Sequence, residues 1–243
     1  MNDFAAQGYQ IIRGIFSAAD IALFREAITE TIDRVARALR TPLSTSHPDA
    51  SFEERLPMIA REDRAYAAAL FHAVMADAQR DERIQTIGTG ERLSSAVSRA
   101  LNPMTRTGHI IRTRATIPEF SAGRAAWHQD VIQRRTDSMT GCASVRVACW
   151  IPLSDVDATT GALEVVPGRW TEPFPHSPGA DGQFAMDDKY VSGSKHCVVP
   201  LRLGDVLLLD RYIPHRSSPV QPGRARWAIV MWVKAGAGNE QSC

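Results

Sequence analysis

The stretch "GHIIRTRATI" (residues 108–117) marks the point where the pattern of the chain changes from helical to extended. Apolar and small side chains alternate here with two arginines, Arg112 and Arg114. The alternating apolar set is Ile111, Thr113, Ala115 and Ile117. Such alternation is typical of a β-strand, because successive side chains of a strand point to opposite faces. The stretch therefore predicts the first strand of a sheet that occupies the second half of the chain.

Residues before this stretch follow a helical period. We predict helices over 17–40, 61–84 and 89–101, the first with Ser17 as N-cap and Asp20 in a capping box. One face of the first helix is apolar and should be packed, namely Ile21, Phe24, Ile28, Ile32, Val35 and Leu39.

Residues after it form short apolar runs separated by turn-forming residues. These runs predict further strands over 143–153, 161–168, 195–201, 205–215 and 224–235. Helices followed by strands indicate an α+β fold, with helices on one face of a β-sandwich or barrel. We expect one domain over 1–243, with helical support over 1–105 and the barrel over 106–236. The long polar segment 171–196 between two strands is predicted to be a lid-like loop.

Composition excludes several classes of function. The 243 residues carry a formal net charge of +1, with 44% hydrophobic residues, so bulk charge gives no reason to expect a nucleic-acid or membrane partner. The sequence lacks an apolar run of about 20 residues and a basic, apolar leader, so a cytoplasmic location is expected. The four cysteines have no C-x-x-C spacing and are expected to be reduced, namely Cys142, Cys149, Cys197 and Cys243. The sequence leaves the oligomeric state open.

The motif "WHQD" (residues 127–130) contains a candidate metal site. On a strand, His128 and Asp130 share one face, and Gln129 points away and serves structural support. Of the seven histidines, His215 is the best third ligand, because it follows the apolar run 205–214 and precedes a turn and a return strand. Two histidines and one carboxylate leave open positions on Fe(II), which a 2-oxoacid and O₂ can occupy.

A 2-oxoglutarate co-substrate also needs a cation for its far carboxylate, and arginine is suited to pair with it. Arg226 lies eleven residues after His215, on the next strand. Arg224 has the same parity, so alternation does not separate the two.

Three motifs together resemble the phytanoyl-CoA dioxygenase family of Fe(II)/2-oxoglutarate oxygenases. They are "WHQD", "CWIPLSDVDATTGALEVVPGRW" (149–170) and "GDVLLLDRYIPHRSSPVQPGRARWAIV" (204–230), and the resemblance covers roughly residues 112–233. It implies a double-stranded β-helix, that is, a jelly-roll or cupin-like barrel. It implies that His128, Asp130 and His215 bind iron and that the 2-oxoglutarate site contains Arg226, Ser217 and Trp150. Trp150 and Ser217 taken alone would be read as a core residue and a turn cap. Relatives often have Ser-His where this chain has Arg169 and Trp170, near the substrate mouth.

The resemblance implies a dioxygenase that consumes O₂ and 2-oxoglutarate, releases succinate and CO₂, and hydroxylates a C–H bond of its substrate. The arginines near the barrel indicate a small polar or anionic metabolite, and an acyl thioester stays open. Desaturation, epoxidation and cyclisation stay open. Asp130 argues against a halogenase, and no catalytic residue is expected beyond the metal ligands. The candidate substrate-binding residues, which solvent-facing strand positions would explain equally well, are Arg112, Arg114, Arg146 and Arg169.

Two other classes of function remain as alternatives. One is a non-catalytic cupin-like barrel that binds a metal or ligand, against which Arg226 argues. The other is a zinc hydrolase with the same three ligands.

Overall fold

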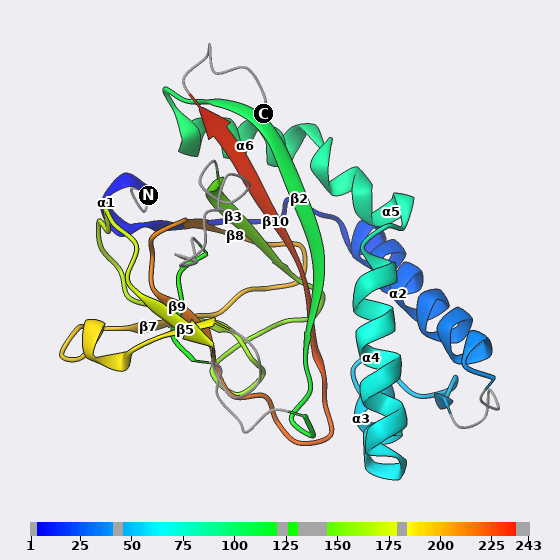
Figure 1. Cartoon of the computed structure of the whole chain (residues 1–243). Coiled ribbons are helices and arrows are strands. Elements are labelled where there is room, and N and C mark those ends of the chain that lie inside the picture. The colour runs from blue at the N-terminus through cyan, green and yellow to red at the C-terminus, as the bar shows by residue number, and fades with distance from the viewer. Residues whose placement is uncertain (1–3, 41–45, 121–125, 131–144, 179–183, 237–243) are drawn as a thin grey trace.

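The computed structural model describes residues 4–40, 46–120, 126–130, 145–178 and 184–236 (Figure 1). Helices dominate the first hundred residues and strands dominate the rest, as predicted. The helices are α1 (Phe4–Gln7), α2 (Ala18–Ala38), α3 (Arg55–Glu62), α4 (Arg64–Ala78), α5 (Glu82–Gln85) and α6 (Glu91–Leu101), with short 3-10 turns at Thr86–Gly88 and Asp188–Tyr190.

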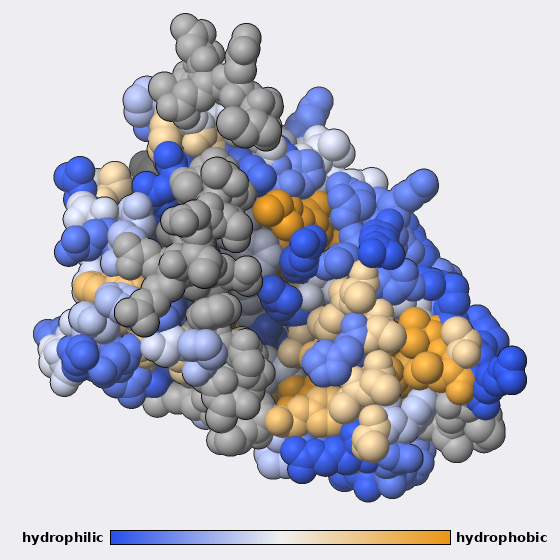
Figure 2. Space-filling model, in the orientation of Figure 1, coloured by the Kyte–Doolittle hydropathy of each residue, from blue (hydrophilic) through white to orange (hydrophobic). Residues whose placement is uncertain are grey.

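Helix α2 begins as the sequence predicts. The Ser17 side chain accepts from the Asp20 backbone N–H, and the Asp20 side chain accepts from the Ser17 backbone N–H. The predicted apolar face is buried up to Val35, but Leu39 caps the helix and is 45% exposed. The prediction that Leu39 packs was therefore wrong, and Figure 2 shows hydrophobic surface over α2.

The prediction of one helix over 61–84 was also wrong, because two aspartates start new helices within it. Asp63 has extended backbone angles (φ −144°, ψ 97°), and its side chain accepts from the Tyr66 N–H at the start of α4. Asp81 caps α5 in the same way through the Arg83 N–H. The hydrophobic period continues across both breaks, so it does not reveal them.

The strands form two main antiparallel sheets. The larger has the order β1 (Tyr9–Ile12), β8 (Val206–Asp210), β3 (Val145–Pro152), β10 (Arg226–Gly236), β2 (Thr105–Thr116). The smaller has the order β7 (Cys197–Val199), β4 (Leu163–Val165), β9 (His215–Ser217). The predicted strand over 205–215 is thus divided between the two sheets, and the sequence pattern did not predict β1.

The larger sheet is covered on both faces. Alternate residues, among them Ile111, Ile151 and Trp227, pack against the helices in one hydrophobic core. Helices α2, α4 and α6 lie on one side of this sheet (Figure 1). The intervening residues, among them Trp150 and Ala228, pack towards the smaller sheet in a second core. The expected α+β jelly roll with helices on one face is therefore confirmed, and the second core is the interior of the barrel.

The segment 171–196 is more regular than the predicted loop. It contains a hairpin of β5 (His176–Pro178) and β6 (Phe184–Met186) and one 3-10 turn. Its role as a lid stays a prediction, as does the division of the chain at residues 105 and 106. In the described ranges, no helix is long and apolar enough to cross a membrane. Cys149 and Cys197 are free thiols, whereas Cys142 and Cys243 lie outside the described residues.

Candidate metal centre

Two extended segments place His128 beside His215. Each residue donates its backbone N–H to the carbonyl of the other, at 3.0 Å and 2.9 Å. This antiparallel bridge puts both side chains on the same face, and the ring centroids are 4.3 Å apart. Backbone pairing therefore positions the two imidazoles before any metal binds.

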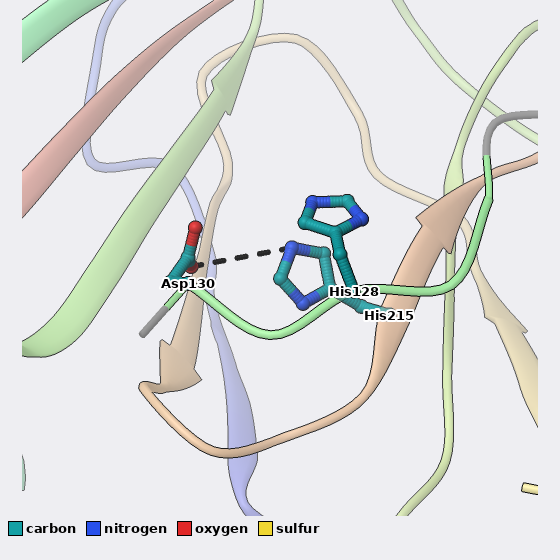
Figure 3. A group of neighbouring side chains, drawn as sticks. All are labelled: His128, Asp130 and His215. Carbon is teal, nitrogen blue, oxygen red and sulfur yellow. Dashed lines mark ion pairs between the residues drawn. The ribbon is translucent and has the colours of Figure 1, made fainter. Parts of the chain in front are cut away.

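Asp130 completes a three-residue cluster with these histidines. Possible ligand atoms from all three residues lie within 4.8 Å of one another. The closest ion pair joins Asp130 Oδ2 to His215 Nε2 at 4.0 Å (Figure 3). The structure thus brings together the three residues that the sequence predicts as metal ligands.

Each residue of the cluster is held in place by a hydrogen bond to its other polar atom. The Nδ1 atoms of His128 and His215 lie 3.1 Å from the carbonyls of Ala126 and Ile213, respectively. A carbonyl only accepts, so each Nδ1 carries the proton and each Nε2 keeps a free lone pair. Asp130 Oδ1 accepts from Trp232 Nε1 at 2.8 Å. Such orienting contacts are typical of metal sites.

The remaining atoms of the cluster fit a divalent cation. Asp130 Oδ2 is buried and has no hydrogen-bond partner in the described part of the chain. Withdrawal from water, reinforced by the neighbouring His215, lowers the pKa of His128 to about 4, so this ring is neutral at pH 7. A buried carboxylate oxygen without a partner is costly, and a metal ion would satisfy it.

Arg226 is a buried cation, 6% exposed, at the start of β10. Its guanidinium donates to Ser217 Oγ at 2.6 Å and to Thr116 Oγ1 at 2.9 Å, and it lies 5.2 Å from the ring centroid of Trp150. Its Nε has no hydrogen-bond partner among the described residues, and burial lowers the pKa of the guanidinium to about 10. The described residues give it hydroxyl groups but no carboxylate, so the site lacks an anion.

The spacing between Arg226 and the metal cluster has the length of a small dicarboxylate. Ser217 lies two residues after His215 on the same face of β9, which corresponds to about 7 Å along a strand. Arg224, in contrast, is exposed in the turn before β10. The structure therefore separates the two arginines that alternation could not separate.

Gln129 points away from the metal cluster, as predicted, and is fully buried. Its side-chain amide donates to the carbonyls of Tyr212 and Glu172, and its oxygen accepts from the Phe174 N–H at 2.7 Å. Gln129 thus ties the metal motif to the turn before His215 and to the 171–196 segment.

The outer face of the smaller sheet carries a row of three side chains, namely Trp127, Arg216 and Glu164. This row lies next to the segments that carry His128 and His215. The Arg216 guanidinium lies 4.2 Å from the ring centroid of Trp127. It also donates twice to Glu164 Oε2, both at 3.1 Å. Because Trp127 precedes His128 and Arg216 follows His215, this row holds the two ligand-bearing segments together.

The four candidate substrate arginines have different environments. Arg112 and Arg114 lie on the barrel side of β2. Arg146 is half-buried near Asp210 and Arg211, where β3 pairs with β8. Arg169 is exposed.

Two residues that were not predicted from the sequence are Thr116 and Trp232, which contact Arg226 and Asp130, respectively. Both could have been found from strand parity. Thr116 follows Arg112 and Arg114 on one face of β2, and Trp232 shares a face of β10 with Arg226.

Comparisons with known proteins were made for the whole chain. A family model described as phytanoyl-CoA dioxygenase (PhyH) matches residues 4–228. No curated protein matches the sequence.

Several solved structures share the fold at low sequence identity. The epimerase SnoN from nogalamycin biosynthesis, in complex with Fe3+, alpha ketoglutarate and nogalamycin RO, has a TM-score of 0.56 and 16% identity, over 95% of this chain and 80% of that one. The alpha ketoglutarate dependent carbocyclase SnoK from the same biosynthesis has a TM-score of 0.57 and 16% identity, over 95% and 81%. EvdO2 from Micromonospora carbonacea var. aurantiaca, complexed with 2-oxoglutarate, has a TM-score of 0.55 and 18% identity, over 98% and 91%. At these identities the likeness establishes the fold.

Proposed function

Because the chain belongs to the phytanoyl-CoA dioxygenase family, whose members use Fe(II), 2-oxoglutarate and O₂, we propose that His128, Asp130 and His215 hold the iron. Three protein ligands leave the other positions of an octahedral metal for co-substrate and O₂. The observation that carries this proposal is the buried Oδ2 of Asp130, which has no partner among the described residues and lies beside two imidazoles with free Nε2 atoms. The chain is thus an Fe(II)/2-oxoglutarate-dependent oxygenase.

Arg226 holds the far carboxylate of 2-oxoglutarate in this proposal. Its planar fork donates to Ser217 and Thr116 and keeps its Nε free for the co-substrate. Trp150 forms one wall of the pocket and excludes water from the ion pair. A zinc hydrolase or a non-catalytic barrel would leave this buried cation unexplained.

The protein contributes positioning more than acid or base chemistry. When bound, iron and 2-oxoglutarate would activate O₂, which oxidises a substrate C–H bond while 2-oxoglutarate is converted to succinate and CO₂. The Trp232 indole fixes the carboxylate of Asp130, and the two backbone carbonyls fix the imidazoles. No further acid or base is required of the described residues.

Hydroxylation of a small polar or anionic metabolite is the specific reaction that we propose. The two arginines on the barrel face of β2 support a polar or anionic substrate. SnoN and SnoK are named an epimerase and a carbocyclase, so the shared fold does not choose among reactions.

The test is an anaerobic titration of the protein with Fe(II) and 2-oxoglutarate. A visible metal-to-ligand charge-transfer band that requires both components is expected, and oxygen should then produce succinate. Absence of the band together with tight retention of zinc would favour the hydrolase.

A further inference from the structure

Arg112 and Arg114 project from β2 towards the inside of the barrel. Their cross-strand partners on β10 are Val230 and Ala228, which belong to the core between the two sheets. Directly paired residues of an antiparallel sheet share a face, so both arginines extend from the face that also carries Thr116. Both arginines are exposed, although their partners on β10, Val230 and Ala228, are buried.

Neither guanidinium has a carboxylate within ion-pair distance in the described ranges, although the carboxylate of Asp130 attracts Arg114 electrostatically. Arg112 donates to the carbonyl of Ile111 at 2.9 Å, and Arg114 lies 5.5 Å from the ring centroid of Trp232. Other exposed arginines of this chain do pair with carboxylates, for example Arg202 with Asp155 at 3.0 Å and Arg34 with Asp77. Two like charges at successive positions of one strand face repel each other unless an anion lies between them.

Their position relates them directly to the metal cluster. The indole that stacks with Arg114 is the one that donates to Asp130. Trp232 therefore separates the guanidinium of Arg114 from a metal ligand by the width of one side chain. An anionic group bound to Arg114 would lie close to the metal cluster, because Trp232 contacts both Arg114 and Asp130.

We propose that Arg112 and Arg114 form the anion subsite for the substrate, which is therefore a small molecule with an oxyanion group, either a carboxylate or a phosphonate. The proposal rests on the proposed function and narrows it, because it excludes neutral polar substrates. Arg226 is a separate anchor for 2-oxoglutarate. Two cationic anchors on one barrel face let the protein bind two anions at once and orient both towards the metal.

Calorimetric titration tests the subsite with methylphosphonate and acetate as probes. The enzyme would be loaded anaerobically with Fe(II) and 2-oxoglutarate, at low ionic strength. Saturable binding of at least one probe is expected. Arg112→Gln and Arg114→Gln should each weaken it about tenfold or more, because a charge-assisted contact is lost. Arg114→Lys should retain part of the affinity, and the relative affinities of the probes distinguish carboxylate from phosphonate.

The control is Arg202→Gln, which removes the same charge from the exposed pair with Asp155 and should leave probe binding unchanged. Equal weakening by this control, unchanged binding in both subsite variants, or no binding to the wild type would each overturn the subsite. A loss of 2-oxoglutarate affinity in Arg112→Gln or Arg114→Gln would also overturn it, since the arginines would then belong to the co-substrate site. Failure of the proposed function is distinct, because it would remove the charge-transfer band from the wild type itself.

Discussion

Arg226 and Asp130 are two charged residues whose buried polar atoms are incompletely paired in the described structure. Each has buried polar atoms without a partner, and each lies among residues that fix its orientation. A buried group of this kind lowers the stability of the free protein, because desolvation is not repaid by a contact. The cost is understandable if a metal and a dicarboxylate complete the contacts.

Replacement of Arg226 should separate co-substrate binding from stability. Arg226→Gln should weaken 2-oxoglutarate binding by about 2–5 kcal/mol, because a buried carboxylate would lose its partner. Iron binding should persist, since Arg226 contacts none of the three ligands. The free energy of unfolding of the metal-free variant should be equal to or higher than that of the wild type, because a buried charge is removed. Equilibrium titration and urea denaturation measure the two effects. A larger co-substrate defect in Arg224→Gln would contradict the assignment.

Neighbouring substitutions in "WHQD" should have opposite consequences. Asp130→Ala should abolish metal binding and succinate formation while the fold persists. Gln129→Ala should retain all three ligands but lower the free energy of unfolding by about 1–3 kcal/mol, because the buried groups that it bridges lose a partner. Metal content, turnover and urea denaturation should be measured for both. Full metal content in Asp130→Ala would end the triad assignment.

Sequence parity predicted where Gln129 points but not what it binds. Its three partners come from residues 172, 174 and 212, which are remote in sequence. The same alternation predicted that the side chains of His128 and Asp130 lie on one face. The approach of His215 depends on a bridge between distant segments. Its position after the apolar run 205–214 made it a candidate, and the family resemblance supported that assignment.

The break between helices α3 and α4 likewise could not be predicted from the periodicity of the sequence. The Asp63 side chain replaces a helical contact with a cap on the Tyr66 N–H, although the apolar period continues. Asp63→Ala should therefore lower the free energy of unfolding by about 1 kcal/mol. Urea denaturation would measure this, with Asp49→Ala as an exposed loop control. An equal effect of the two substitutions would show that Asp63 has no capping role.

The outer row of the smaller sheet should influence the metal without contacting it. Arg216→Met removes the stacking on Trp127 and both hydrogen bonds to Glu164, so the segments bearing His128 and His215 should be held less tightly. We expect weaker Fe(II) binding and a shifted charge-transfer band, with circular dichroism unchanged. Arg202→Met, at an exposed surface pair, is the matched control. An unaltered metal affinity and band in Arg216→Met would show that the row is structural only.

At the scale of the whole molecule, the order of elements could be predicted but their pairing could not. Alternation predicted β2, and apolar runs bounded by turn residues predicted β3 and β10, because each of these strands is long and contributes to the core. The four-residue β1 is too short for a periodic signal, yet it pairs with β8, almost two hundred residues later. The division of 205–215 between two sheets depends on a turn after Asp210, which the continuous apolar run conceals.

Ligand-dependent stability tests the site as a whole. Most of the hydrophobic core lies between the helices and the larger sheet, so the fold should not require the metal. A ligand that binds only the folded state at about 100 times its Kd adds about 2.7 kcal/mol, which for a chain of this size raises Tm by about 5–10 °C. Ni(II) is a redox-inert substitute for this measurement. The Tm of the wild type should rise on addition of Ni(II) and rise again on addition of 2-oxoglutarate. The Tm of Arg226→Gln should rise only with Ni(II), because the metal ligands remain. The Tm of Asp130→Ala should rise with neither, because the co-substrate chelates the metal. If 2-oxoglutarate stabilised Asp130→Ala as much as the wild type, its binding would not depend on the metal cluster, and the two sites would have to be assigned to separate functions.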